Sequence, residues 1–372
     1  MPWCTPRKAI PLIALSTFLV TLIIWFNRFD TPRQQLSNLS SLYHDSISSG
    51  VRRPFSPGAA KPPGSAYSRV LVIAKTSEED VGWVRDDLPN LPTVIYQVDK
   101  ANATYRVPKN KGNEAMVYLT YLIDHYDQLA DTTIFIHAHS ITWHNNILLD
   151  LSTPMTIQRL QDDRVWRQGF MNLRCHLEPG CPSIFLNQTT SNVGHKEKPS
   201  DEMFRPETFK ELFPGHKVPP VLSEPCCAQF AVSRDRVKDN PRKTYEHLRA
   251  WLLATPLDDA SSGRVFEYVW QYLFTRNAEV CPSMHACYCD GYGICFGDDI
   301  RLEEWMKTFK LKEKIDDEMS WAKRRGESPS VIQEIADRRG KLEKQLEKGK
   351  QEAYERGEKA ENRASAREPL PE

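Results

Sequence analysis

Three short β-branched runs, together with one amphipathic segment among them, constrain the fold of this chain most. The runs are residues 70–74, 92–97 and 132–137, and each predicts a buried strand. Residues 112–129, which precede the third run, carry apolar side chains at helical spacing. Strand, strand, helix and strand with short links predict an α/β domain with a mostly parallel sheet flanked by helices.

Two histidines lie at the end of the third predicted strand. Alternate side chains of a strand face the same way, so His137 and His139 are expected on one side. They could share a divalent metal with His144 or Asp150, or they could be hydrogen-bonded histidines that shape a cleft. Because ligands bind at the carboxyl ends of parallel strands, we expect Trp143 and His144 to line a ligand-binding cleft there.

Another strand is predicted in the second half of the chain. Residues 226–234 are mostly small and apolar and end in Ser233-Arg234. This composition predicts a buried strand that brings polar side chains to the edge of a cleft. Gln229 and Ser233 are candidates for the cleft wall, and Arg234 is a candidate to bind phosphate.

A lone acid, Glu267, lies in the apolar helical stretch 265–274. Burying a carboxylate is costly unless it has a partner or a task. Glu267 could be a boundary acid paired with Arg264 or Arg249. It could also be a general base whose apolar surroundings raise its pKa towards working pH. Trp270 follows in the same stretch and is a further candidate for the cleft.

A polar turn precedes the predicted helix 112–129. Lys109, Asn110, Lys111 and Gly112 lie in this turn. The helix N-terminus and the two lysines could bind a diphosphate. The alternative is an ordinary polar turn that ends in a capping acid.

The two ends of the chain predict its layout. Residues 9–26 are an uncharged apolar run of eighteen residues, near the minimum for a membrane-spanning helix. Arg7 and Lys8 precede this run and no cleavage signature follows, which predicts an uncleaved signal anchor. A Ser/Pro/Gly-rich stretch then predicts a flexible stem. The predicted order is a cytosolic tail, an anchor, a stem, a lumenal α/β domain and a charged helical or disordered tail, at residues 1–8, 9–26, 27–68, 69–310 and 311–372.

This layout is typical of single-pass type II enzymes of the Golgi or ER membrane, with the catalytic domain in the lumen. Many glycosyltransferases share it, as do some proteases and sulfotransferases. Sequons at Asn38, Asn102 and Asn187 agree with a lumenal domain. The membrane is then one partner of the chain. Nucleic acid is not expected as another, because 49 basic residues balance 49 acidic ones.

Eight of the nine cysteines would lie in the oxidising lumen, where an even count predicts disulfides. One dense cluster also resembles zinc-ligand spacing, although disulfides are the simpler interpretation there. That cluster is Cys281, His285, Cys287, Cys289 and Cys295. We expect the neighbours Cys226 and Cys227 to bond to different partners.

Several segments between about residues 69 and 281 resemble the fungal family called domain of unknown function 3431. The matching landmarks are Asp80 with Trp83 and the segments 110–119, 135–144, 226–234 and 263–270. The name of this family carries no established activity, so the resemblance does not settle the function.

A more distant resemblance points to a reaction. About fifty residues are similar to the second half of the core-2 branching and xylosyl-transferring glycosyltransferases. The matching order is residues 229–234, Trp251, Thr255, Glu267 and Trp270. This resemblance implies a GT-A fold in a type II Golgi protein that works without a metal. It also implies that Glu267 deprotonates the acceptor hydroxyl, although Val265-Phe266 stands where the family has Pro-Asp.

The leading hypothesis is an inverting glycosyltransferase that moves a sugar from a nucleotide sugar to a glycan or protein hydroxyl and requires no cofactor. The predicted lumenal domain has no Asp-x-Asp motif. Lys109, Lys111 or Arg234 would then neutralise the diphosphate, or His137 and His139 would hold a divalent metal instead. The metal-independent alternative is simpler, because it needs only basic residues that are present in the sequence.

Two other hypotheses remain open. One is a metal-dependent lumenal hydrolase built on His137, His139 and His144. The other is a non-catalytic, membrane-tethered binding protein that uses the charged tail as its partner surface.

Overall fold

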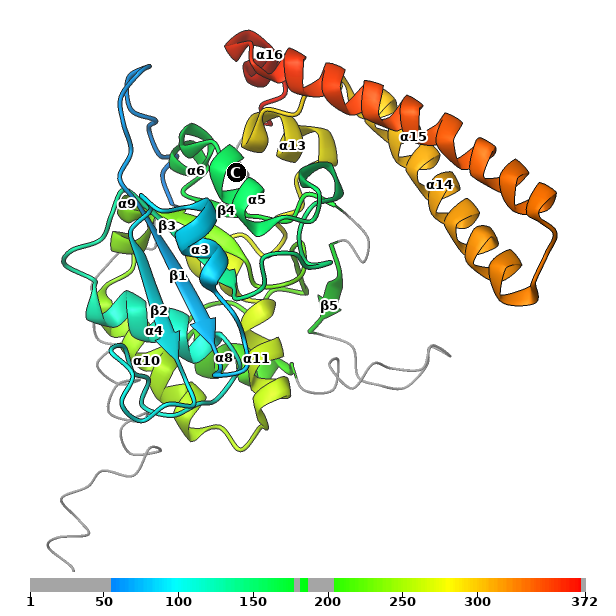
Figure 1. The fold of residues 1–372 in the computed structure, drawn as a ribbon. Helices are drawn as coiled ribbons and strands as arrows, with labels where there is room; N and C mark the ends of the chain where they lie inside the picture. The colour runs from blue at the N-terminus through cyan, green and yellow to red at the C-terminus, as the bar shows by residue number, and fades with distance from the viewer. Residues whose placement is uncertain (1–54, 177–180, 187–203, 369–372) are drawn as a thin grey trace, which may run out of the picture.

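The computed structural model describes residues 55–176, 181–186 and 204–368 (Figure 1). The predicted cytosolic tail and signal anchor, most of the predicted stem, and the sequons at Asn38 and Asn187 lie outside the described residues. Across the described ranges, no helix combines the length and the apolar character needed to cross a bilayer. The membrane anchor therefore stays a prediction.

Five strands form one mixed sheet in the order β2, β1, β3, β7, β4. These strands are β1 (Arg69–Lys75), β2 (Thr93–Gln97), β3 (Thr132–His137), β4 (Phe170–Asn172) and β7 (Phe230–Ser233). β1 pairs in parallel with β2 and β3, whereas β7 is antiparallel to β3 and β4. The three strands predicted in the first half are confirmed, but the expected mostly parallel pairing holds only among those three.

β7 runs against β3 because the chain enters the sheet at the carboxyl end of β3. Phe230 pairs with Phe135 near that end, and Ser233 pairs with Thr132 at the opposite end. The residues just before β7 are therefore near the end of β3 at His137. The residues just after β7 are a full strand length away.

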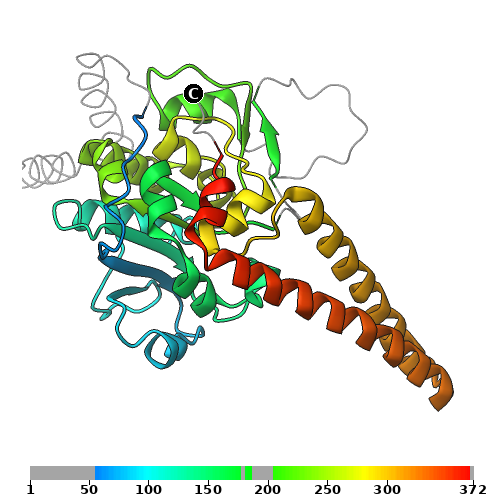
Figure 2. The same ribbon diagram turned by 90° about the horizontal axis from the view of Figure 1, so that it is seen from above.

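Helices cover both faces of the sheet (Figures 1 and 2). Along β1, Val70 and Val72 join one hydrophobic core while Leu71 and Ile73 join the other, as strand alternation requires. Around the first core lie α4 (Ala115–Asp124), α8 (Pro206–Leu212), α9 (Arg234–Lys238), α10 (Arg242–Ala254), α11 (Asp259–Glu267) and α12 (Trp270–Thr275). Around the second lie α3 (Gly82–Asp87), η1 (Ile147–Leu149), α5 (Thr153–Arg159), α6 (Asp162–Gln168) and α13 (Met284–Tyr292).

A small second sheet and four disulfides complete the body. The sheet pairs β5 (Ser183–Phe185) with β6 (Val221–Ser223) in antiparallel fashion. The disulfides are Cys175–Cys287, Cys181–Cys281, Cys226–Cys227 and Cys289–Cys295. The preference for disulfides over zinc is confirmed. The expectation that Cys226 and Cys227 bond to different partners is wrong, because the other six described cysteines pair among themselves.

The charged C-terminal segment forms a helical arm. α14 (Asp299–Arg325) and α15 (Pro329–Gly357) pack side by side and project from the body (Figures 1 and 2), and α16 (Ala360–Ser365) follows. The predicted domain boundary at residue 310 falls inside α14. Among the described residues, the outer part of the arm has a small core of Ile315, Ala322 and Ile335. Its base, by contrast, joins the second core of the body.

Trp305 fastens this base. Its indole N–H donates to the Leu346 carbonyl oxygen at 2.9 Å, and its ring stacks on Phe309. We expect Trp305→Ala to lower the unfolding free energy by about 3 kcal/mol, because the substitution removes a large packed ring and leaves a cavity. Urea denaturation followed by circular dichroism measures this change. Trp321→Ala is the matched control, since Trp321 on the same arm is 52% exposed and its loss should cost less than about 0.5 kcal/mol. Equal effects of the two substitutions would contradict the assignment.

Candidate functional site

Two adjoining hollows lie at the carboxyl ends of β1 and β3. The first hollow has a volume of about 390 Å³ and the second about 330 Å³. Residues of the first alone include Trp143, Glu224, Cys226, Cys227, Arg264 and Glu267. Residues of the second alone include Lys75, Glu79, Asn110, His139 and Asp259. Asn113, Glu114, His137 and His144 line both, so they form the wall that the hollows share.

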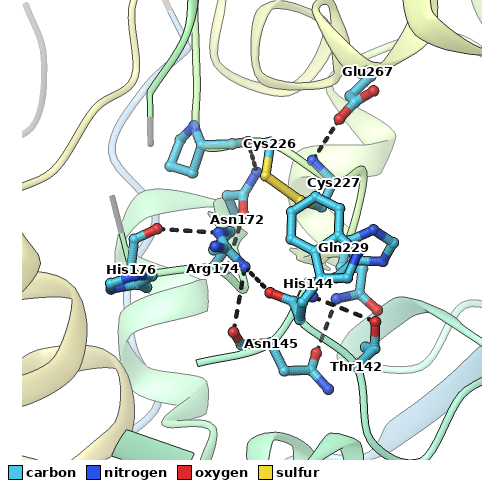
Figure 3. The surroundings of a disulfide bond; sticks show 12 residues. Thr142, His144, Asn145, Asn172, Arg174, His176, Cys226, Cys227, Gln229 and Glu267 are labelled. Atoms are coloured by element: carbon cyan, nitrogen blue, oxygen red, sulfur yellow. Dashed lines mark hydrogen bonds between the residues drawn. A yellow bond between two sulfur atoms is a disulfide. The ribbon is translucent and has the colours of Figure 1, made fainter. Parts of the chain in front are cut away.

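Glu267 lies in the first hollow, held by two partners. It is the last residue of α11, and its Oε1 accepts the Cys227 backbone N–H at 2.7 Å (Figure 3). Its Oε2 lies 3.3 Å from Nε of Arg264. The pairing with Arg264, which was one of the two sequence interpretations, is present. The carboxylate also lies in a cleft, and its role as a general base stays a prediction.

The turn that offers this N–H has an unusual backbone. Cys227 (φ 90°) and Ala228 (φ 47°) are consecutive left-handed residues, a conformation that non-glycine residues adopt rarely and at a cost. The disulfide between Cys226 and Cys227 closes the same turn. Both cysteines are buried, yet they line the first hollow. Disulfide, turn and carboxylate thus form one local unit.

Glu114 is a second carboxylate of the site, and sequence reasoning assigned it only a capping role. It occupies the N-cap position of α4, but among the described contacts its side chain makes no capping hydrogen bond. Desolvation raises its pKa to about 7, the negative charge of Glu267 adds to the rise, and Arg264 opposes it. A carboxyl group with a pKa near 7 can donate or accept a proton at neutral pH. The sequence signal was an acid directly before the mostly apolar helix Ala115–Asp124.

Glu224 is a third carboxylate, deeper in the wall and 3% exposed. It accepts hydrogen bonds from the Asn172 side-chain amide at 3.2 Å and from the Gln271 backbone N–H at 3.4 Å. Burial raises the pKa of Glu224 well above its usual value, and the nearby charge of Glu267 raises it further. Nothing in its sequence neighbourhood singled it out, since only the fold brings it beside α12.

The histidines form a pair in the shared wall. Nδ1 of His137 lies 2.9 Å from Nδ1 of His144, so one ring donates to the other. Burial, followed by the neighbouring charges, lowers the pKa of His137 to about 3 and that of His144 to about 4. Both rings are therefore neutral at physiological pH.

His139 lies just beyond the end of β3. β3 ends at His137, so strand alternation does not extend to His139, which is 57% exposed with its Nε2 3.7 Å from Oε1 of Glu79. Both His137 and His139 line the second hollow, and a divalent metal shared between them stays a prediction. Throughout the described part of the chain, no group of three or more His, Cys, Asp or Glu side chains is arranged to hold a metal ion.

Gln229 supports the cleft from behind, whereas Trp143 lines it. Gln229 is buried behind the wall, where it accepts the His137 backbone N–H at 3.1 Å and donates to Asn145 at 3.0 Å (Figure 3). It braces the loop after β3 and is not open to a ligand. Trp143 is 58% exposed at the first hollow, and the guanidinium of Arg174 donates to its carbonyl oxygen.

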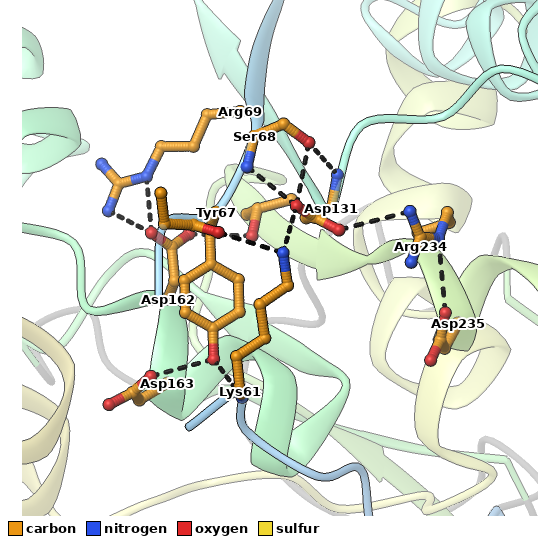
Figure 4. A network of polar contacts seen from close by, with 11 residues as sticks. Lys61, Tyr67, Ser68, Arg69, Asp131, Asp162, Asp163, Arg234 and Asp235 are labelled. Atoms are coloured by element: carbon orange, nitrogen blue, oxygen red, sulfur yellow. Dashed lines mark hydrogen bonds and ion pairs between the residues drawn. The ribbon is translucent and has the colours of Figure 1, made fainter. Parts of the chain in front are cut away.

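Three predicted cleft residues lie away from the cleft. Ser233 caps α9 by accepting the Arg236 N–H. Arg234 follows β7 at the end of the sheet opposite the cleft, where it pairs with Asp131 at 3.2 Å (Figure 4). Trp270 is fully buried in the first core. The predictions for Ser233 and Arg234 fail because β7 runs antiparallel. That for Trp270 fails because the apolar stretch breaks into α11 and α12.

Asp131 also ties down the end of the predicted stem. It accepts from Lys61 Nζ at 2.7 Å and from the Ser68 N–H at 2.8 Å (Figure 4). Residues 55–68 thus pack on the domain, which the expectation of a flexible stem up to residue 68 did not include.

The polar turn before α4 is only partly open to a ligand. Lys111 is buried and its Nζ donates to the Thr255 carbonyl oxygen, so it fastens this turn to the end of α10. Gly112 is left-handed (φ 69°) and is also buried. Asn110 lines the second hollow, and Lys109 beside it is exposed.

An α/β protein with a carboxylate-lined cleft at the ends of its parallel strands is the class that fold and site define. A family model described as "Protein of unknown function (DUF3431)" matches residues 71–290. The chain belongs to this DUF3431 family, and the match includes both hollows, while the arm of α14 and α15 lies beyond it. No curated protein and no solved structure matches the chain.

Glu114 makes stability depend on pH. Its pKa rises from the usual 4.5 to about 7 on folding, so the folded state binds more protons than the unfolded state between these values. The unfolding free energy therefore falls as pH rises through this window. We expect Glu114→Gln to match the wild type near pH 4.5 and to be more stable at pH 8, by up to about 3 kcal/mol.

Urea denaturation of both proteins from pH 4.5 to 8 measures this difference. Glu78→Gln, at an exposed position, is the control and should show no pH-dependent gain. A gain by Glu114→Gln that is equal at both ends of the pH range would contradict the raised pKa.

Proposed function

We propose that this chain is an inverting glycosyltransferase, anchored in a secretory-pathway membrane, that moves a sugar from a nucleotide sugar to a hydroxyl acceptor. The observation that carries the proposal is the pair of adjoining hollows whose common wall holds the carboxyl group of Glu114 and two histidines. Group transfer requires two substrates to meet at one point, and the wall of Glu114, His137 and His144 is such a meeting place. The mixed α/β sheet is compatible with the GT-A architecture that the distant resemblance implies.

Glu267 is the proposed base. Its anchoring by the Cys227 N–H and Arg264 orients the carboxylate within the first hollow. The acceptor oxygen would attack the anomeric carbon while its proton passes to Glu267, and the bond from that carbon to the diphosphate would break. The nucleoside diphosphate then leaves with the electron pair of that bond. Glu114, with its pKa near 7, is suited to hold or relay the proton next.

The second hollow is the proposed donor site, and its charges differ from the sequence expectation. Lys111 and Arg234 are engaged elsewhere. The lining holds Lys75 together with the acids Glu79 and Asp259, and the exposed Lys109 precedes Asn110 of the lining in sequence. We propose that Lys75 and Lys109 provide the positive charge for the leaving group without a cofactor.

A divalent cation is the second candidate for that charge. Glu79 and His139 lie 3.7 Å apart at the edge of the second hollow. Cations such as Mg²⁺ are often held by one or two protein side chains together with substrate phosphates. These two residues would fit that role. Stoichiometric zinc in the purified chain would instead favour the hydrolase hypothesis.

A thermal-shift panel tests the donor. We expect one nucleoside diphosphate or nucleotide sugar to stabilise the full chain in detergent, by about 2.7 kcal/mol at 100 times its dissociation constant. The panel is run with EDTA and with Mg²⁺ or Mn²⁺, so that a metal requirement shows as a shift seen only with the metal. If no nucleotide stabilises the chain under either condition, the transferase proposal fails and the non-catalytic binding protein gains support.

Glu267→Gln tests the base. We expect this variant to transfer sugar about 10²- to 10⁴-fold more slowly, since general base catalysis contributes this much, and to bind nucleotide like the wild type. A radiolabelled donor measures transfer once the panel has identified it. Glu246→Gln is the matched control, because it breaks an equivalent arginine pair, with Arg242 at 3.2 Å, on α10 away from both hollows. Normal turnover by Glu267→Gln would remove Glu267 from the mechanism.

A further inference from the structure

The first hollow has one apolar surface made of two unlike parts. The Cys226–Cys227 disulfide is uncharged and lines the hollow although both cysteines are buried, at 8% and 5% exposure. Trp143 presents an aromatic ring that is 58% exposed at the same hollow. Single exposed aromatic side chains are common on proteins, so the argument depends on how Trp143 is held.

Trp143 is held firmly for a side chain so exposed. Arg174, itself 2% exposed, donates to the Trp143 carbonyl oxygen and lies with its guanidinium 5.5 Å from the centre of the indole ring. The His144 ring meets the indole edge-on at 4.2 Å between ring centres. His144 is in turn bonded to His137 in the shared wall. A rigid aromatic surface loses little entropy when a ligand packs on it.

Polar groups border this apolar surface. Glu267, Glu114 and Asn113 line the same hollow and offer carboxylate and amide oxygens, and Arg264 offers donors. A ligand that fits must therefore combine an apolar face with several hydroxyl groups. A pyranose ring has this combination, with C–H bonds on its face and hydroxyls around its rim.

The described lining of the hollow has no unpaired cation to offer an anionic ligand. Among these described residues, Arg264 alone carries a positive charge, and its guanidinium pairs with Glu267 at 3.3 Å. The two histidines of the wall are neutral at physiological pH. A diphosphate would therefore find no free positive charge in this described lining, and the first hollow is suited to an uncharged acceptor.

We propose that the Cys226–Cys227 disulfide and Trp143 form a subsite for a neutral pyranose ring, so that the acceptor is a glycan and not an unmodified protein. The identification of this ligand as the acceptor rests on the proposed function. The binding of the sugar ring itself does not. Glycan binding then requires both the aromatic ring and the intact turn that the disulfide closes.

Titration of the full chain in detergent with free saccharides tests this subsite. The panel contains trisaccharides of glucose, mannose, galactose, xylose and N-acetylglucosamine, and a second panel of unglycosylated Ser/Thr peptides is run in parallel. Isothermal calorimetry without any nucleotide measures the dissociation constants. We expect one saccharide type to bind and the peptides not to bind.

The variants then locate the binding. Trp143→Ala should weaken saccharide binding at least tenfold, while Trp143→Phe should retain most of it. Trp321→Ala, on the arm and 52% exposed, is the matched control and should bind like the wild type. The double substitution of Cys226 and Cys227 by alanine should also weaken binding at least tenfold. If circular dichroism shows that this double variant is unfolded, the comparison of Trp143→Ala with Trp143→Phe alone tests the subsite.

Several outcomes overturn the proposal. Binding of no saccharide, binding of peptides instead, or a Trp143→Ala variant that binds like the wild type would each do so, as would a folded double cysteine variant of unchanged affinity. Failure of the proposed function is distinguishable from these. Saccharide binding without any nucleotide-induced stabilisation would retain the subsite and reject the transferase. Nucleotide binding without saccharide binding would reject the subsite and leave the transferase proposal standing.

Discussion

The hydrogen bond from the Cys227 N–H to Glu267 is the interaction on which the cleft depends. It joins the turn before β7, which starts at the carboxyl end of β3, to the last residue of α11. The sheet and a helix of the first core thereby meet at one carboxylate. The left-handed backbone at Cys227 and Ala228 is tolerated because the disulfide and this bond hold it. The first hollow opens beside this junction.

Burial explains the electrostatics of the site. Hydrophobic cores on both faces of the sheet reach up to the cleft, so the carboxyls at its wall lose most of their water. Desolvation is the largest cause of the raised pKa of both Glu114 and Glu224, and each also lies near the charge of Glu267. Among the described residues that line the first hollow, Arg264 alone carries a positive charge, and it pairs with Glu267. The same burial thus prepares one hollow for proton transfer and a neutral ligand.

Local patterns predicted the elements well and their long-range pairing poorly. The strands 70–74, 92–97 and 132–137 were predicted because runs of β-branched residues favour a strand wherever they occur in a sequence. Glu267 was singled out because it interrupts an apolar stretch. The direction of β7 was missed, and with it the true positions of Ser233 and Arg234. Strand direction depends on which end of β3 the chain reaches first, and this is a property of contacts about a hundred residues apart.

The sequence by itself determined that this is an α/β chain with a polar site after its third strand and an acid of interest at Glu267. It also determined that eight cysteines would pair. Only the tertiary structure decided that Cys226 and Cys227 pair with each other, that Glu114 joins the site, and that Lys111 is used to fasten a turn. The physical reason is that the burial and the contacts of a side chain are set by its position in the folded protein. The charge, pKa and role of a residue change with these surroundings, although the residue type stays the same.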